Sequence, residues 1–311
     1  MKRFGYLICL LVGLPVAYVM WLLVAQAAVP SDGKPLPEKL LDVALEHVKS
    51  QGPDADVAQF VSMSGQAAWR RREAFVGATA PYLQSKDPVK VAGAIGVLYR
   101  FRGHRPMISH GDFEKENAEF FSRLDKLVYA GFDHFHALAD DRVYHSLALF
   151  LGTSPSPESK RELLRIAAQT PEKEQALICL AWHRDPDDMK ALLPYMLEDS
   201  PAAGSLPYHF RNSYGDASVP YLKKALKESK SASVRLRAAF QLVQLRVPDG
   251  FQHLASVARR NPKAEGLRPR PLDLVRQFAI DNLDLPSDAS SQEYIAEYIE
   301  KKQAQLCQPR Q

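Results

Sequence analysis

Apolar residues recur at helical spacing along most of the chain, and Pro, Gly, Asp and Ser separate the helical stretches. Strict alternation of apolar and polar residues is absent and β-branched runs are short, so the pattern predicts an all-α fold. The expected helices span residues 37–50, 54–63, 66–84, 87–101, 112–130, 141–151, 157–169, 172–184, 187–198, 216–229, 232–246, 249–260, 271–284 and 291–305.

An internal repeat with a shift of 62 positions relates residues 176–192 to residues 238–254. The matching pairs are Ala176 with Ala238, Leu180 with Leu242, Arg184 with Arg246, Pro186-Asp187 with Pro248-Asp249, and Leu192 with Leu254. Each copy predicts a helix, a tight turn and a second helix, because Pro and Asp both suit a first helical turn. A weaker unit between the copies contains Val219, Leu222 and Leu226, so one repeat has half of 62, about 31, residues. Chance matching in a chain rich in Ala and Leu is the alternative.

Residues 233–239, which read Ser-Val-Arg-Leu-Arg-Ala-Ala, resemble the first-helix consensus of HEAT repeats, where a Val-Arg pair precedes a small residue. Val275-Arg276 begins a second copy, and residues 87–94 are a degenerate earlier one. The resemblance covers residues 141–285 and is poor over residues 38–140; Ser231 stands where the family usually has an acidic residue.

The HEAT resemblance implies an armadillo-type α-solenoid, a stack of helical hairpins in which each hairpin buries its apolar face against its neighbours. The short repeat is similar to that of compact bacterial HEAT-like units. We therefore expect an irregular helical part at residues 38–140, repeats at residues 141–305 and a polar tail at residues 306–311.

The N-terminal residues 1–28 have the pattern of a secretory signal peptide or a transmembrane anchor. Lys2 and Arg3 precede an uncharged apolar stretch at residues 4–24, and small residues follow it, with Ala27 at the expected cleavage point. Basic residues on the cytoplasmic side place the rest of the chain outside the cytoplasm, either membrane-anchored or periplasmic or secreted after cleavage. A Pro-rich linker at residues 29–37 follows. A buried helix of a cytosolic fold is the alternative interpretation.

Familiar catalytic patterns are absent from the sequence: it has no Gly-rich phosphate loop, no Gly-x-Ser-x-Gly, no Cys-x-x-Cys and no His-Glu-x-x-His. We therefore expect no cofactor, and binding is favoured over catalysis. The three cysteines do not form a disulfide framework. Cys179 and Cys307 could form one bridge, but two unrelated thiols are the favoured interpretation.

Histidines cluster between residues 104 and 145, which leaves a metal-dependent or His/Asp-based enzyme as the alternative function. The candidates for metal ligands are His134, His136 and His145, beside Asp140 and Asp141. On one helix, however, His134 and His136 would point about 200° apart and could not share an ion. Histidines in surface loops or helix caps are the favoured interpretation, so no metal site is assigned.

Basic residues concentrate in residues 223–276, where thirteen Lys and Arg stand against four Asp and Glu, a net charge of +9. The whole chain carries only +4, so this asymmetry predicts a partner that is an acidic protein or an anionic surface or polymer. Nucleic acid is not expected outside the cytoplasm. The candidate binding residues are Lys223, Lys224, Lys227, Arg235, Arg259, Arg260, Lys263, Arg268 and Arg270, with Tyr208, Phe210 and Tyr221 as exposed aromatics. A solvated basic face is the alternative.

Overall fold

The computed structural model describes residues 69, 72–103, 113–198, 203–260 and 270–308. The signal or anchor at residues 1–28, its apolar helix, the linker at residues 29–37 and the first two expected helices lie outside these ranges. Every regular element within the ranges is helical, which confirms the all-α fold class. No helix among the described residues is both long enough and apolar enough to cross a membrane.

The described helices follow the chain from α5 to α19. Their bounds are α5 (Arg72–Thr79), the 3-10 helix η2 (Ala80–Gln84), α6 (Pro88–Arg102), α7 (Phe113–Glu116), α8 (Ala118–Tyr129), α9 (Phe132–Leu138), α10 (Asp141–Gly152), α11 (Pro157–Gln169), α12 (Lys173–Trp182), α13 (Pro186–Leu197), α14 (Leu206–Tyr214), the 3-10 helix η4 (Gly215–Ser218), α15 (Val219–Glu228), α16 (Ala232–Gln244), α17 (Pro248–Arg260), α18 (Pro271–Leu283) and α19 (Gln292–Leu306). Each helix expected from residue 141 onward is present, whereas α9 and α14 were not expected.

Several helices begin with the same residue pattern, an Asp or Ser N-cap followed by Pro. The side chains of Asp87, Ser156 and Asp185 each accept a hydrogen bond from a backbone N–H in the first helical turn. Pro follows directly, where its missing N–H has no helical partner to lose. These caps explain why the helix starts could be read from the sequence.

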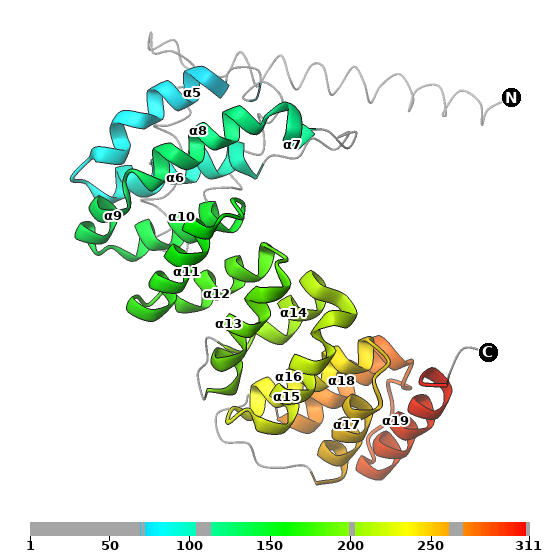
Figure 1. Ribbon diagram of the computed structural model, residues 1–311. Coiled ribbons are helices and arrows are strands. Elements are labelled where there is room, and N and C mark those ends of the chain that lie inside the picture. The colour runs from blue at the N-terminus through cyan, green and yellow to red at the C-terminus, as the bar shows by residue number, and fades with distance from the viewer. Residues whose placement is uncertain (1–68, 70–71, 104–112, 199–202, 261–269, 309–311) are drawn as a thin grey trace, which may run out of the picture.

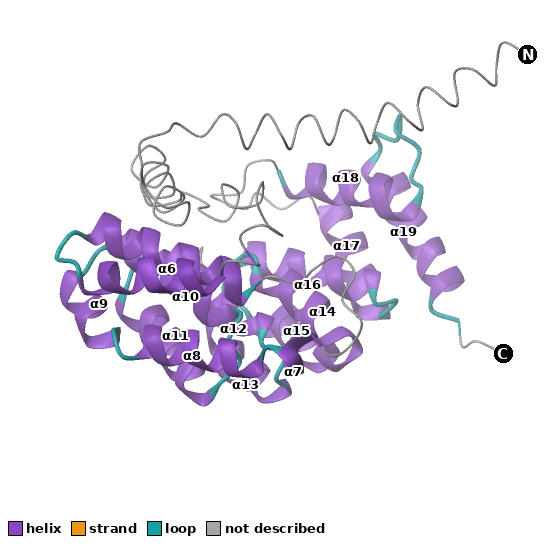
Figure 2. Ribbon diagram, turned by 90° about the horizontal axis from the view of Figure 1, so that it is seen from above, coloured by secondary structure: helices purple, strands orange, loops and turns teal. Residues whose placement is uncertain are grey.

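Consecutive helices from α10 onward pack in pairs, and alternate helices form two rows. In one row α6, α10, α12, α14, α16 and α18 contact one another in succession. The partner helices α11, α13, α15, α17 and α19 form the other row, in which α13 contacts α15 and α17 contacts α19. Figure 1 shows the pairs following one another from α5 at one end to α19 at the other. Seen from above, α6 and α10 lie toward one side of the stack and α8, α11 and α13 toward the other (Figure 2).

The apolar core runs between the two rows. One cluster of buried side chains extends from α5 to α16 and a second from α16 to α19, so α16 contributes to both. Among the largest side chains with almost no exposed surface are Phe135, Phe150, Phe210 and Phe251. Cys179 is buried and Cys307 is half-buried, and both are free thiols, so the bridge considered from the sequence is not formed.

Candidate anion-binding groove

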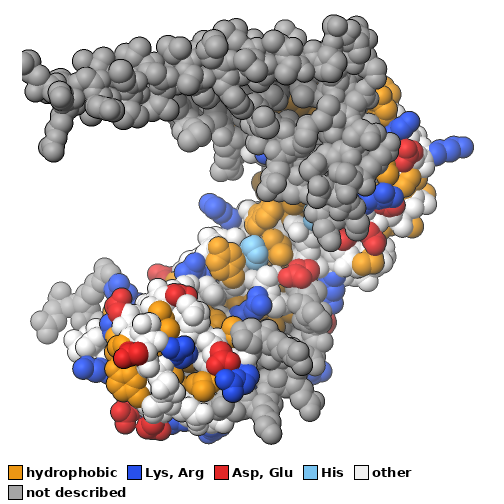
Figure 3. All heavy atoms as spheres, turned by 180° about the vertical axis from the view of Figure 1, so that it is seen from behind, with side chains coloured by type: hydrophobic (Ala, Val, Ile, Leu, Met, Phe, Trp, Pro, Cys, Tyr) orange, Lys and Arg blue, Asp and Glu red, His pale blue; other side chains and the backbone are white. Residues whose placement is uncertain are grey.

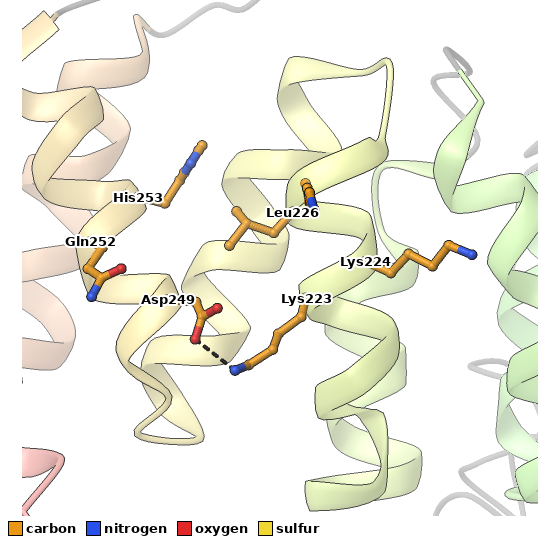
Figure 4. A pocket seen from close by; sticks show the side chains of 7 residues that line it. Lys223, Lys224, Leu226, Asp249, Gln252 and His253 are labelled. Atoms are coloured by element: carbon orange, nitrogen blue, oxygen red, sulfur yellow. Dashed lines mark ion pairs between the residues drawn. The ribbon is translucent and has the colours of Figure 1, made fainter.

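In the described part of the basic segment, α15 and α17 border an open groove of about 620 Å³. We call it the lysine groove. Its lining residues are Lys223, Lys224, Leu226, Lys227, Asp249, Gln252 and His253 (Figure 4).

The α15 wall is basic because this helix is amphipathic. Leu222 and Ala225 are fully buried against the core. Lys223, Lys224 and Lys227 project from the opposite side and are exposed. The helical spacing of the apolar residues therefore fixes where the three ammonium groups lie.

The α17 wall is more polar and nearly neutral. Phe251 and Leu254 face the core, which turns Gln252 and His253 toward the groove. Asp249 follows Pro248 in the first turn of α17, where the helix dipole favours a carboxylate.

Only part of the positive charge in the groove is neutralised. Lys223 Nζ lies 2.8 Å from Asp249 Oδ2, and both side chains are nearly half exposed. Figure 4 shows Lys223 directed at Asp249 and Lys224 directed away from α17. Lys224 Nζ lies 3.9 Å from Glu228 Oε2, a weak exposed pair. Lys227 has no ion pair with any described residue, so the groove keeps a net positive charge.

His253 adds a neutral hydrogen-bonding group at pH 7. Burial lowers the pKa of His253, and the nearby positive charge of Arg235 lowers it further. Arg235 itself closes the turn before α16, because its Nη1 donates to the carbonyl oxygens of Ser229 at 2.5 Å and Lys230 at 3.1 Å. Arg235 thus stabilises the wall of the groove instead of lining it.

The remaining basic candidates do not join the groove. Arg259 donates to Glu293 Oε1 and Glu300 Oε2, each at 2.9 Å, and so ties α17 to α19. Arg270 pairs with Asp273 at 3.0 Å, and Arg260 is exposed at the end of α17. Lys263 and Arg268 lie outside the described residues. The structure therefore brings Lys223, Lys224 and Lys227 together and leaves the other candidates elsewhere.

The aromatic candidates have different environments. Tyr208 is 50% exposed, and Tyr221 is half-buried with its ring 6.1 Å from that of Phe210. The expectation of an exposed Phe210 is wrong, because its side chain points into the core from α14 and has no exposed surface. Since α14 was not expected, the sequence did not indicate which of its faces is buried.

Each described histidine of the 104–145 cluster has a local partner. His134 Nε2 lies 2.9 Å from the carbonyl oxygen of Ser85, and His145 Nδ1 lies 3.0 Å from Glu172 Oε2. His136 pairs with the buried Glu162. Among the described residues, no group of three or more His, Cys, Asp or Glu could hold a metal ion. His104 and His110 lie outside the described residues.

The sequence missed the residues that complete the groove opposite the lysines. Gln252 and His253 belong to α17, and only the packing of α17 beside α15 brings them to Lys223. Comparisons of the chain with known protein families, with curated proteins and with solved structures find no match. Function must therefore be inferred from the residues of this chain.

Proposed function

We propose that this protein is a HEAT-like binding scaffold, exported or membrane-tethered, that holds an acidic segment of a protein partner in the lysine groove. The observation that carries the proposal is the charge balance of the groove. Three exposed lysines of α15 line the groove, and the lining contains one carboxylate, that of Asp249, which pairs with Lys223. Glu228 lies 3.9 Å from Lys224 but does not line the groove, and Lys227 has no ion pair with any described residue. Complementary charge attracts and orients an acidic partner.

The packing of the helices supports the solenoid part of the proposal. Helical hairpins that follow one another in two rows are what stacked repeats of about 31 residues require. The Val-Arg pairs in α16 and α18 are the residues of the HEAT resemblance, and Val234 and Val275 are fully buried. A stack of this kind exposes long surfaces on which partners can bind.

An acidic protein segment fits the groove better than a membrane surface does. The groove is a recess between two helices, and it combines lysines with the amide of Gln252 and the apolar side chain of Leu226. A flat layer of anionic headgroups would contact projecting side chains instead of a recess. An extended chain with carboxylates can lie between α15 and α17 and use all three kinds of contact.

Charge reversal tests the groove. The variant Lys223→Glu/Lys224→Glu/Lys227→Glu is compared with Lys90→Glu/Lys126→Glu/Lys301→Glu, which makes the same charge change at exposed lysines elsewhere. Binding of a fluorescein-labelled poly-glutamate peptide to the full chain is followed by anisotropy at physiological salt. We expect the groove variant to bind about tenfold more weakly or worse, and the control to bind within about twofold of the unaltered chain.

Two results would overturn the proposal. Equal losses in both variants would show that overall charge, not the groove, attracts the peptide. Groove-dependent binding of phosphatidylglycerol vesicles without binding of poly-glutamate would assign the groove to lipid. The proposed location outside the cytoplasm is tested separately. Alkaline phosphatase is fused after Gln311, and this enzyme becomes active only outside the cytoplasm.

A further inference from the structure

We propose a second binding site, in which an apolar side chain flanked by carboxylates in a protein partner inserts between Trp182 and Tyr208. The site is a cleft of about 310 Å³ formed by the end of α12 and the exposed side of α14. We call it the aromatic cleft. Its lining residues are Trp182, Arg184, Tyr208, His209, Asn212 and Ser213. The inference rests on the proposal that the protein is a binding scaffold, but not on the lysine groove.

The cleft exposes two of the largest apolar side chains of the described residues. Trp182 is 37% exposed and Tyr208 is 50% exposed, whereas most other large apolar side chains are buried. In the space-filling view, hydrophobic side chains reach the surface in the middle of the molecule among charges of both signs (Figure 3). Trp, Tyr and Arg in a pocket are the residue types that dominate binding energy in protein interfaces.

The two aromatic rings leave the cleft open between them. Among the described residues, Trp182 makes no ring contact with Tyr208. Tyr208 instead meets the edge of His209 at 5.3 Å and lies 5.9 Å from the guanidinium of Arg211. Trp182 and Tyr208 therefore line a space that an inserted side chain can fill, instead of covering each other.

The internal repeat offers a comparison for Trp182, because the equivalent position in the second copy has no exposed aromatic side chain. The residue 62 positions after Trp182 is Gln244, at the end of α16. Gln244 accepts a hydrogen bond from Arg211 and donates to Asn282 Oδ1 at 2.9 Å, so it links α14, α16 and α18. A polar side chain closes the surface there, and an exposed Trp occupies the matching position of α12.

Close packing of α10 on α12 fixes the Trp side of the cleft. A Cβ atom on Gly152, at the end of α10, would lie 2.8 Å from Cys179 Cβ and 3.0 Å from Trp182 Cε3. Only glycine leaves room for α12 at this distance, and the indole rests on the backbone of α10. Trp182 is therefore held in place before any partner binds, which lowers the entropy cost of binding.

The charge of the cleft selects carboxylates beside the inserted side chain. Arg184 is exposed, and no described residue forms an ion pair with it. Arg211 bonds to the neutral amides of Gln244 and Asn212. Arg184 thus lines the cleft without a carboxylate partner among the described residues, and Arg211, whose guanidinium lies 5.9 Å from the Tyr208 ring, adds positive charge beside it. Arg binds carboxylates well through its planar fork.

A panel of fluorescein-labelled seven-residue peptides tests the site. One set carries Trp, Phe or Leu at the centre with Asp on both sides, and matched peptides carry Ala at the centre or Lys in place of Asp. Anisotropy is measured with the full chain. We expect at least one acidic peptide with an apolar centre to bind, and both matched forms to bind about tenfold more weakly or worse.

Variants then locate the binding. Trp182→Ala, Tyr208→Ala and Arg184→Glu are each expected to weaken binding of the peptide about tenfold. Tyr294→Ala removes another large aromatic that is exposed among the described residues, 44% on α19, and is expected to change nothing. Arg184→Glu and Tyr208→Ala alter exposed side chains, so circular dichroism should show that both variants fold. The triple lysine variant should still bind the peptide, which separates this site from the groove.

Three results would overturn the inference. The first is that no peptide of the panel binds. The second is that cleft variants bind as tightly as the unaltered chain. The third is that an N-acetylglucosamine trimer binds in a Trp182-dependent way while no peptide does, which would assign the cleft to glycans.

Discussion

Arg184 and Arg246 share a left-handed backbone conformation, with φ of 58° and 59°, although 62 residues separate them. Each follows a helix of the same row, α12 or α16, and each precedes the turn into the second helix of its pair. Gly215, which also has a positive φ of 53°, lies halfway between them at the end of α14. The hairpin turns thus recur at the interval of about 31 residues that the sequence repeat predicted.

The conformation of Arg246 leads to the first prediction. Arg246 N–H donates to the Val243 carbonyl at 2.9 Å and Val247 N–H to the Leu242 carbonyl at 2.8 Å, the Schellman pattern in which glycine is favoured. A left-handed non-glycine residue costs about 1–2 kcal/mol. We expect Arg246→Gly to raise the free energy of unfolding by about 1 kcal/mol and Arg246→Val to lower it.

Urea unfolding measures both effects, and Arg237→Gly is the matched control. Arg237 is exposed inside α16, where glycine should cost about 1 kcal/mol. If Arg246→Gly destabilised the protein as much as Arg237→Gly does, the left-handed turn would impose no cost on arginine.

The sequence predicts the helices of this fold well where their caps and periodicity agree. Asp185-Pro186 and Ser156-Pro157 mark helix starts that the structure confirms. Helix α14 was missed because its nine residues mix Pro, Tyr, His, Asn and Ser, and only Leu206, Pro207 and Phe210 are buried. Its formation depends on packing against α12 and α16, which local pattern does not encode.

The candidate groove was predictable only in part, because contacts between residues distant in sequence also determine which side chains line it. Lys223 and Lys227 are four residues apart on one helix, so helical spacing places them on the same side, and Lys224 is next to Lys223 in sequence. Arg259 shares their charge but is paired with Glu293 and Glu300, which are more than thirty residues away in sequence. Long-range pairing of this kind decides which basic side chains remain available, and it could not be deduced from composition.

An ion pair between α11 and α13, in which the carboxylate is buried and the lysine is partly exposed, leads to the second prediction. The carboxylate of Asp188 has no exposed surface and pairs with Lys160, while His183 Nδ1 lies 3.9 Å away. Burial raises the pKa of Asp188, and the charge of Lys160 opposes this effect. We expect Lys160→Met to lower the free energy of unfolding by about 2–4 kcal/mol at neutral pH, because it strands a buried charge.

The double variant Lys160→Met/Asp188→Ala tests the reason for that loss. It should unfold at a higher urea concentration than Lys160→Met alone, since no unpaired carboxylate remains. The loss in Lys160→Met should also shrink as the pH falls toward the raised pKa of Asp188, where the carboxyl is neutral. A double variant less stable than Lys160→Met would show that the pair contributes mainly packing.

Close approach of α17 to α16 leads to the third prediction. A Cβ atom on Gly250 would lie 2.7 Å from the Ala239 carbonyl oxygen and 2.8 Å from both Leu242 Cβ and the Val243 nitrogen. Backbone atoms cannot move aside as a side chain can, so Gly250→Ala should destabilise the protein by about 1–3 kcal/mol. Gly77→Ala is the control, because Gly77 is exposed within α5 and nothing lies within 4 Å of its added Cβ. Thermal unfolding should show a higher midpoint for Gly77→Ala and a lower one for Gly250→Ala.

Two half-buried histidines predict how stability depends on pH. Burial lowers the pKa of His209, and the charge of Glu174 opposes this effect. Burial and then the charge of Arg235 lower the pKa of His253. In the unfolded chain both groups would titrate near the ordinary value of 6.5, so the unfolded state binds more protons just below this pH. Stability should therefore fall as the pH drops from about 6.5 through the lowered pKa values of the folded state.

The variant His209→Gln/His253→Gln isolates this contribution, because glutamine keeps hydrogen-bonding groups and does not titrate in this range. Urea unfolding at about pH 7.5 and about pH 5.5 should show a smaller acid-induced loss of unfolding free energy for the variant than for the unaltered chain.

Protonation of His253 would also add positive charge to the lysine groove, so poly-glutamate should bind the unaltered chain more tightly at the lower pH while the chain stays folded. This gain should disappear in the single variant His253→Gln and persist in His209→Gln, since only His253 lines the lysine groove. Equal gains in the two single variants would place the titrating group elsewhere in the molecule.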